Sequence, residues 1–225
     1  MARLRTHRVE PAPPGYPEVI RGYGLELRAW DSALVKQMAR WGERGFPFHP
    51  FDLGHLRDRG RAESALAWAR TPGAHRHLVA IEDGAAVGRV SVNTQDAAGL
   101  YLWSVHVPPE HEGRGLARRM LAALMEWCEA KYPGRDFVLT TNLFATPAHR
   151  TYAALGFEIA ETLWHFDAQL GAALWRADPA ERQPIAPYTR FASGRWEVLT
   201  YLMRRKAGAP MWLGRDAPPW ASNSG

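Results

Sequence analysis

Cysteine, lysine and long apolar runs are all scarce in this sequence. The single cysteine, Cys128, excludes an internal disulfide framework and is typical of a reducing compartment, so a cytoplasmic location is expected. No stretch of about 18 apolar residues is present, which argues against a membrane-spanning helix and predicts no membrane partner. The basic first residues are followed by no apolar segment and therefore do not resemble a secretory signal.

The basic residues are nearly all arginine, because the only lysines are Lys36, Lys131 and Lys206, and the formal net charge is +5. An arginine-rich composition suits a plain charged surface first and a site for a polyanionic small molecule second. Nucleic-acid binding is the least favoured interpretation, since the arginines are scattered along the chain and do not form a basic stripe. No metal site is predicted.

The length of 225 residues and a hydrophobic fraction of 46% predict one ordinary domain with extensions. We expect an N-terminal arm at residues 1–22, a domain at 23–206 and a C-terminal tail at 207–225. The predicted strands are 25–30, 77–82, 86–93, 100–107, 137–141, 157–166 and 196–203, and the predicted helices are 32–42, 61–70, 116–132 and 147–155. This order, β-α-α-β-β-β-α-β-α-β-β, indicates an α/β (α+β) fold with a mixed sheet and helices on both faces.

Local signals support the boundaries of these elements. Asp31 is a suitable N-cap for the first helix, and Asp83-Gly84 is a typical two-residue hairpin turn. Thr146 is a suitable N-cap for the fourth helix, with a proline as the first helical residue. Residues 168–195 hold apolar residues among prolines and glycines, so we interpret them as a partly ordered insertion.

Residues 100–115 and the helix after them carry the strongest functional signal. Two prolines end the strand, and Gly113 and Gly115 allow a tight turn into the helix. Free N–H groups and the positive end of the helix dipole make such a turn an anion site. Three arginines near the start of the helix also suit an anion: Arg114, Arg118 and Arg119. The turn is neither the dinucleotide fingerprint nor a P-loop, because the third glycine and a GKS or GKT sequence are absent.

In its context this turn resembles the acetyl-coenzyme-A motif of the GNAT superfamily, the GCN5-related N-acetyltransferases, which is written (R/Q)-x-x-G-x-(G/A). Three parts carry the resemblance: the meander with Asp83-Gly84 and Val87-Gly88, the run VHVPPEHEGRGLARRML, and the run ATPAHRTYAALGF, in which a tyrosine precedes Gly-Phe. The resemblance extends over residues 25–166 and the strand at Trp196. It implies a GNAT fold with a mostly antiparallel central sheet.

The resemblance implies acetyl-CoA as the co-substrate and assigns residues to it. The backbone of the strand would pair with the pantetheine arm, and the amides of the turn would hold the pyrophosphate. Tyr152 would lie near the coenzyme sulfur and protonate the leaving thiolate, a role that suits a phenol. The residues implied for coenzyme binding are Val105, His106, Val107, Gly113, Arg114, Gly115, Leu116, Ala117 and Arg118.

The implied site departs from the family's pattern in two respects. Glu112 stands where Arg or Gln is usual, and we expect its carboxylate to turn outward, so that the loop binds phosphate through its backbone. No general base follows from the resemblance either, because the matching positions hold Tyr101 and Trp103. Lone histidines that could serve are His49, His55, His106 and His165, and an amine that arrives neutral needs no base.

Two aromatic segments, residues 46–55 and the insertion, would form the acceptor pocket. Aromatic walls suit an apolar or cationic amine. The aromatic residues are Phe46, Phe48, Phe51, Trp175, Tyr188 and Phe191. The few acidic candidates, Asp52, Asp178 and Glu181, give no strong signal for a polyamine or an aminoglycoside.

The function implied is transfer of acetyl from acetyl-CoA to a primary amine of a small molecule or peptide, by direct attack in a ternary complex. The alternative is a non-catalytic module that binds acyl-CoA or regulates another protein, which Glu112 and the missing base favour. A nucleic-acid-binding protein is the third possibility and rests on charge alone. A homodimer is possible, since two tryptophans of the tail, Trp212 and Trp220, could cover a partner subunit.

Overall fold

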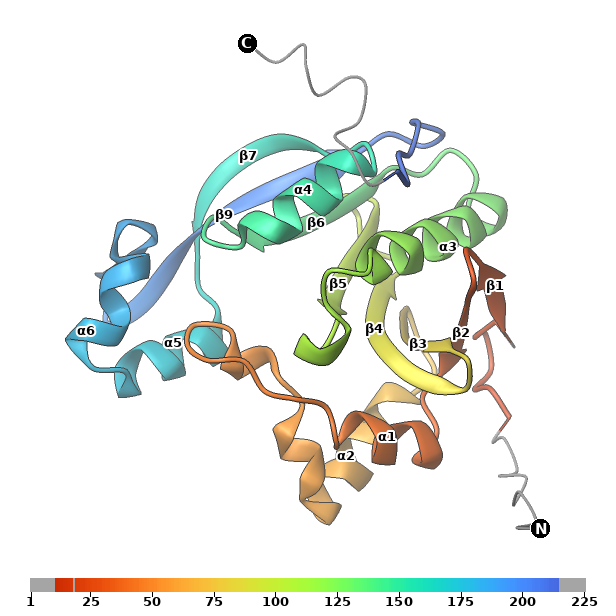
Figure 1. Cartoon of the computed structure of the whole chain (residues 1–225). Helices are drawn as coiled ribbons and strands as arrows, with labels where there is room; N and C mark the ends of the chain where they lie inside the picture. The colour runs from red at the N-terminus through yellow and green to blue at the C-terminus, as the bar shows by residue number, and fades with distance from the viewer. Residues whose placement is uncertain (1–10, 18, 215–225) are drawn as a thin grey trace.

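One twisted sheet runs through the protein, with helices on both of its faces (Figure 1). The computed structural model describes residues 11–17 and 19–214. Within these residues the strand order is β1-β2-β3-β4-β5-β6-β9-β7, and β8 pairs with β9 outside this path. The strands are β1 (Ile20–Gly22), β2 (Leu25–Ala29), β3 (His75–Glu82), β4 (Ala85–Asn93), β5 (Leu100–His106), β6 (Phe137–Asn142), β7 (Glu158–His165), β8 (Thr189–Ala192) and β9 (Arg195–Arg205).

Helices α1 and α2 cover one face of the sheet, and α3 and α4 cover the other. The helices are α1 (Ser32–Met38), α2 (Arg59–Ala69), α3 (Leu116–Lys131), α4 (Thr146–Ala154), α5 (Ala168–Arg176) and α6 (Pro179–Arg182). Short 3₁₀ helices lie at η1 (His49–Phe51), η2 (Gly54–Arg57), η3 (Pro109–His111) and η4 (Gln183–Tyr188). The mixed, mostly antiparallel sheet with helices on both faces confirms the predicted fold class.

The sheet opens between β5 and β6. Strands β3, β4 and β5 form the predicted antiparallel meander, whereas β5 and β6 are parallel and pair only at Leu100↔Phe137 and Tyr101↔Val138. The register between β4 and β5 shifts after Arg89, and Ser104 adopts φ +55, so β5 bends as it leaves β6. Among the described residues, no strand therefore lies beside β5 on the β6 side after Tyr101.

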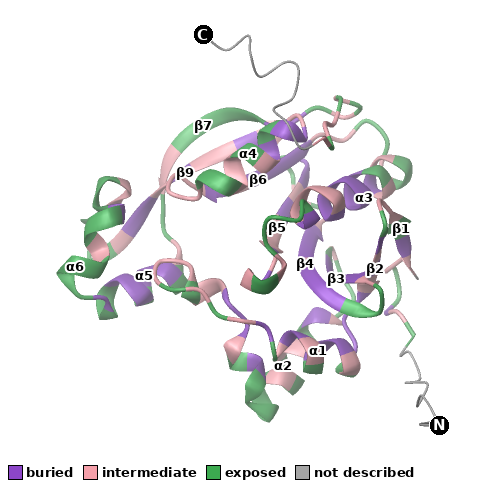
Figure 2. Cartoon of the chain, viewed as in Figure 1, coloured by how far each residue is buried: buried purple, intermediate pink, exposed green. Residues whose placement is uncertain are grey.

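Alternation along the strands builds two cores, one on each face. Leu78 packs with α3, whereas its neighbour Val79 packs with α1 and α2. Helix α3 buries the face that carries Met120 and Leu124, both 0% exposed, as its i, i+4 spacing predicted. Figure 2 shows this buried stripe running along α3 toward β4 and β5. The helix is thus held firmly at the end of the open strand.

Residues 168–195 have more regular structure than the sequence indicated. Asp167 caps α5 by accepting from the N–H of Leu170 at 2.8 Å, and α6 begins with a capping box between Asp178 and Glu181. Strand β8 then pairs with the first half of β9. Prolines at the starts of α6 and η4 fit helix N-termini, which is why they did not prevent helix formation.

Other boundaries differ from the prediction by a few residues. Helix α1 ends at Met38, four residues before the glycine expected to stop it. Helix α4 begins at Thr146, so that residue is the first helical residue and cannot be its own N-cap. Part of the predicted N-terminal arm forms β1, which pairs with β2.

The C-terminal segment lies on the domain as far as it is described. The N–H of Trp212 donates to the carbonyl of Ala154 at 2.7 Å, whereas Trp220 lies outside the described residues. Across the described chain, none of the helices combines the length and the apolar character needed to cross a membrane.

Candidate active site

The N-terminus of α3 is open toward solvent. Gly113 and Gly115 adopt φ +75 and +71. A Cβ atom added to either glycine would have no neighbouring atom within 4 Å. Gly115 occupies the N-cap position and offers no side chain to the helix. The first bond within the helix joins the N–H of Arg119 to the carbonyl of Gly115 at 3.1 Å. The N–H groups of residues 116–118 therefore have no partner inside the helix and can bind an anion.

The three arginines at this end of α3 differ in their partners. Glu82 binds Arg119, with Nη2 and Oε1 2.8 Å apart, and also binds Arg114. These contacts lower the pKa of Glu82, chiefly through the hydrogen bond from Arg119. Arg118 donates to the carbonyl of Gly214, but its Nε is covered and has no partner in the described chain. Arg114 and Arg119 are thus partly engaged by Glu82, whereas Arg118 keeps a covered donor without a partner in the described chain.

Two acidic residues of the loop before α3 bind the segment between α1 and α2, residues 42–52, which we call the α1–α2 segment. Counted back from Gly113, the Arg/Gln position of the motif falls on Glu110, which corrects its assignment to Glu112. Both carboxylate oxygens of Glu110 accept from the N–H of Gly42 at 3.2 Å. Glu112 is exposed, as expected, and its Oε1 lies 3.7 Å from Nη1 of Arg44.

The end of β5 presents a free edge where the coenzyme was expected. Tyr101 is the last residue of β5 that pairs with β6. The side chains of Val105 and Val107 are partly buried against the core that α3 forms. Their backbone, in contrast, follows the edge that β6 has left. An extended chain with amide groups could pair with this edge.

The side chain of His106 is committed to the opposite face. It is 4% exposed, its ring stacks on Trp41 with centroids 5.5 Å apart, and its Nδ1 lies 2.6 Å from Nη2 of Arg44. Burial lowers the pKa of His106, with further contributions from Arg89 and Arg44. The imidazole is therefore neutral at neutral pH and accepts from Arg44. Of His106, therefore, only the backbone could contact the coenzyme. The buried imidazole is not placed to act as a general base for an amine.

Tyr152 of α4 lies near Tyr101, the last residue of β5 that pairs with β6. It is 7% exposed and its ring packs against Phe157, with centroids 6.0 Å apart. Burial raises the pKa of its hydroxyl, and Tyr101 adds to the effect. Tyr101 in turn is hydrogen-bonded to Oγ1 of Thr140 at 2.7 Å, across the start of the opening. Among the described residues, none forms a hydrogen bond with the hydroxyl of Tyr152.

A group of rings on the α1–α2 face was missed by the sequence reasoning. His75 and His77 of β3 lie beside Trp103 of β5, with ring centroids 5.7 and 5.3 Å from it. Trp68 of α2 packs on His77 at 4.1 Å. The pKa of His77 falls to about 4, mainly through burial, and its Nδ1 bonds to Oγ of Ser91 at 2.8 Å. The i, i+2 spacing of the two histidines on a strand was the available signal.

The two aromatic segments expected to form the acceptor pocket do meet. Phe48 packs edge-on against Phe144, with centroids 5.6 Å apart. Phe46 and Phe51 pack against a buried cluster that includes Leu170 of α5. The α1–α2 segment and α5 are therefore in contact beside the opening of the sheet.

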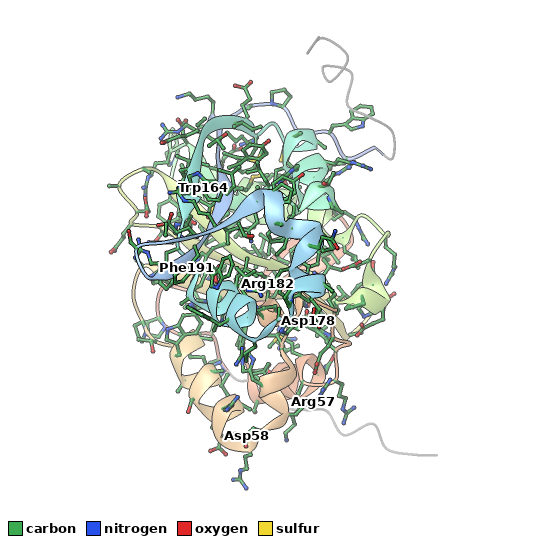
Figure 3. All side chains as sticks on the ribbon, turned by 90° about the vertical axis from the view of Figure 1, so that its left-hand side faces the viewer. Arg57, Asp58, Trp164, Asp178, Arg182 and Phe191 are labelled. Atoms are coloured by element: carbon green, nitrogen blue, oxygen red, sulfur yellow. The ribbon has the colours of Figure 1, made fainter. Side chains whose placement is uncertain are left out.

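The remaining aromatic residues of the insertion point outward. Trp175 and Phe191 are 63% and 51% exposed and pack on each other with centroids 5.2 Å apart. Figure 3 views the molecule from the insertion, and Phe191 lies there with Trp164 and Arg182. These two rings are thus largely exposed, in contrast to Phe46 and Phe51, which pack against the buried cluster.

The other predicted residues do not converge on one point. His49 and His55 are exposed, and burial lowers the pKa of His55, whereas His165 lies exposed on the edge strand β7. Asp178 and Glu181 cap α6, as described above. Asp52 is 6% exposed, and its Oδ1 accepts from Nε of Arg44 at 3.1 Å. No free carboxylate of the predicted set is left for a cationic substrate.

Solved structures with this architecture are acetyltransferases. An acetyltransferase of the GNAT family from Bacillus anthracis matches with a TM-score of 0.60 and 11% identity, over 85% of this chain and 99% of that chain. A chimera of the Vibrio cholerae spermidine N-acetyltransferase SpeG and hSSAT matches with a TM-score of 0.57 and 15% identity, over 82% and 96%. At such low identity these similarities establish the fold alone. No curated protein matches the sequence.

The open sheet and the open helix terminus are thus those of the fold that these acetyltransferases share. The family described as Acetyltransferase (GNAT) family matches residues 35–157, which is more than half of the chain. The protein belongs to the GNAT family and is an N-acetyltransferase, as the resemblance predicted. Acetyl-CoA is the co-substrate of this family.

Proposed function

We propose that this protein transfers acetyl from acetyl-CoA to a primary amine of a small molecule or peptide, by direct attack in a ternary complex. One arrangement supports the proposal above all. β5 loses its partner β6 after Tyr101 and continues through Gly113 and Gly115 into the uncapped N-terminus of α3. A free strand edge suits an amide-containing arm, and a helix N-terminus suits phosphate.

The residues at this end of α3 fit coenzyme A. The amides of residues 113–118 would hold its pyrophosphate, in space that a side chain at either glycine would fill. The covered Nε of Arg118, which has no partner within the described chain, would gain an anionic acceptor. The backbone of residues 105–107 would pair with the pantetheine arm.

Tyr152 would act as the acid of the transfer. A C–N bond forms as the thioester C–S bond breaks, the amine releases its proton to solvent, and the phenol gives its proton to the thiolate. Because burial raises the pKa of Tyr152, its hydroxyl keeps the proton throughout the usual pH range and remains available as a donor.

The acceptor would approach from the face that α1 and α2 cover. Phe48 and Phe144 meet there and suit an apolar part of the amine. No histidine of the predicted set is placed to remove a proton, so the amine would react in its neutral form. Cys128 is a buried free thiol, which fits the cytoplasmic location that we propose.

Release of free thiol from acetyl-CoA in the presence of a panel of amines tests the proposal. We expect acetyl-CoA to raise the melting temperature of the protein and at least one amine to release thiol, with the acetylated amine identified by mass spectrometry. Absence of both a coenzyme-dependent rise in melting temperature and thiol release would reject it.

A further inference from the structure

Arg89, on β4, is a guanidinium without an anionic partner. Its Nη2 donates to the carbonyl of Phe51 at 3.3 Å, and its Nε is covered and unpartnered within the described chain. No carboxylate of the described residues forms an ion pair with it. The nearby Asp52 is taken by Arg44, with Nε and Oδ1 3.1 Å apart. Arg44 also lies 3.7 Å from the exposed Glu112, so Asp52 is the one buried carboxylate of the described residues that these two arginines share.

Asp52 is the carboxylate that acts on Arg89 among the described residues, and Glu112 lies farther out, beside Arg44. Burial lowers the pKa of His106, and it lowers the pKa of His77 to about 4; the charge of Arg89 contributes in both cases. Both rings are therefore neutral at neutral pH. Burial together with Arg44 lowers the pKa of Arg89 to about 10, while Asp52 acts in the opposite direction. Arg89 remains charged, and a largely buried cation whose nearest carboxylate is paired with another arginine would be stabilised by an anionic ligand.

A second donor on the same face is also unsatisfied. The indole Nε1 of Trp103 is covered and has no partner in the described chain. Trp103 pairs with Ser91 across β4 and β5, two residues along β4 from Arg89. It holds one of the two positions where the resemblance would place a general base. Two orphan donors, one of them charged, are complementary to a carboxylate.

We propose that the amine acceptor carries a carboxylate, which Arg89 binds as its counter-ion with the indole N–H of Trp103 as a second donor. This inference rests on the proposed function and names the class of its substrate. The aromatic contact between Phe48 and Phe144 suits an apolar side chain, so the substrate would be an apolar or aromatic amino acid. A polyamine is disfavoured, because Arg89 would repel it and Asp52 is already paired.

Matched amines test the proposal on the wild-type protein. Phenylalanine and phenethylamine differ only in the carboxylate, and spermidine is the polycationic comparison. A charged hydrogen-bonded contact predicts that phenylalanine is preferred by about tenfold or more in kcat/KM. Calorimetric titration of the CoA-bound protein with the same amines measures the preference independently of turnover. Equal or better use or binding of phenethylamine or spermidine would overturn the proposal.

Variants then assign the preference to Arg89. Arg89→Gln should remove the preference for phenylalanine by about tenfold and leave the KM for acetyl-CoA within about twofold of wild type. Arg89→Lys, which keeps the charge, should retain part of it. Arg59→Gln, which breaks an exposed ion pair with Glu63, is the matched control and should change neither value.

The two possible sources of the anion are separated by which KM changes. A rise in the KM for acetyl-CoA in Arg89→Gln, with the amine preference intact, would assign the counter-ion to a coenzyme phosphate and overturn the proposal. If Arg89→Gln does not fold, Arg89→Lys and the wild-type comparison of amines still decide. Failure of acetyl-CoA to bind or react would reject the proposed function, whereas selective binding of phenylalanine would still support the carboxylate site.

Discussion

Replacing Tyr152 with phenylalanine removes one hydroxyl group and keeps the packing of the ring. Tyr152 is 7% exposed, and its ring lies 6.0 Å from that of Phe157. Its hydroxyl has no hydrogen-bond partner among the residues that the structure describes, so the variant leaves no group unpaired. The free energy of unfolding should therefore change by less than about 0.5 kcal/mol.

The effect on rate should be larger than the effect on stability. A positioned general acid contributes about 10²- to 10⁴-fold, and it works best when its pKa matches the task. Burial raises the pKa of Tyr152 above that of a free phenol, and so further above that of a thiol. We therefore expect the lower end, a loss of about 100-fold in kcat, equal to about 2.7 kcal/mol. The KM for acetyl-CoA should stay within about threefold of wild type, because the variant removes only the hydroxyl near the sulfur and keeps the proposed contacts to the pantetheine arm and the pyrophosphate.

Thiol release at saturating acetyl-CoA, with melting curves for each protein, measures both effects. Tyr132→Phe is the matched control, since Tyr132 packs on Trp127 at the far end of α3, with centroids 6.1 Å apart. The raised pKa also predicts that the wild-type rate shows no alkaline loss due to Tyr152 below about pH 10. A folded Tyr152→Phe protein that retains kcat within about threefold of wild type would refute the acid role.

Other predictions concern the coenzyme loop and two ion pairs. Gly113→Val should weaken binding of acetyl-CoA in calorimetric titration, because φ +75 is unfavourable for a β-branched residue and the valine side chain would enter the open space beside α3. Gly194→Val is the control, since Gly194 has φ +77 in the β8–β9 turn, and this variant should bind acetyl-CoA normally. The pKa of Glu82 is lowered from its ordinary value of 4.5, so the charged carboxylate stabilises the folded state at pH values above 4.5, and this contribution is lost as the pH falls. The free energies of unfolding measured in urea at pH 7 and at pH 4 should therefore differ less for Glu82→Gln than for wild type. Arg205→Met should lower the free energy of unfolding by about 3 kcal/mol in urea, because Nη1 of this 1% exposed side chain lies 2.6 Å from Oε1 of Glu129; a loss below about 1 kcal/mol would contradict a structural role for the pair.

The coenzyme side could be predicted from the sequence because its parts are continuous in the chain. Residues 100–118 hold the strand, the turn and the helix start, and each part has a local signal. Gly113 and Gly115 adopt the positive φ angles that a tight turn requires. The roles of these residues toward the coenzyme stay predictions, but the backbone arrangement needed only local rules.

The acceptor side could not be predicted because its parts come from distant segments. His77 and Trp103 lie on β3 and β5, and only the sheet register, through Ser91, brings them together. The missing counter-ion of Arg89 became visible only once Asp52 was found to bind Arg44. Pairings of this kind depend on tertiary structure, for which hydrophobic periodicity holds no information.

The acidic residues of the coenzyme loop connect the two sides. A carboxylate in the position of the family's Arg or Gln would repel a pyrophosphate if it faced the α3 terminus. Instead Glu110 accepts from the N–H of Gly42, and Glu112 lies beside Arg44. The loop thus lacks the family's basic side chain and gains an attachment for the α1–α2 segment, which covers the acceptor face. In the proposed function, phosphate binding would fall to the amides of residues 113–118 and to Arg118, whose covered Nε has no partner within the described chain.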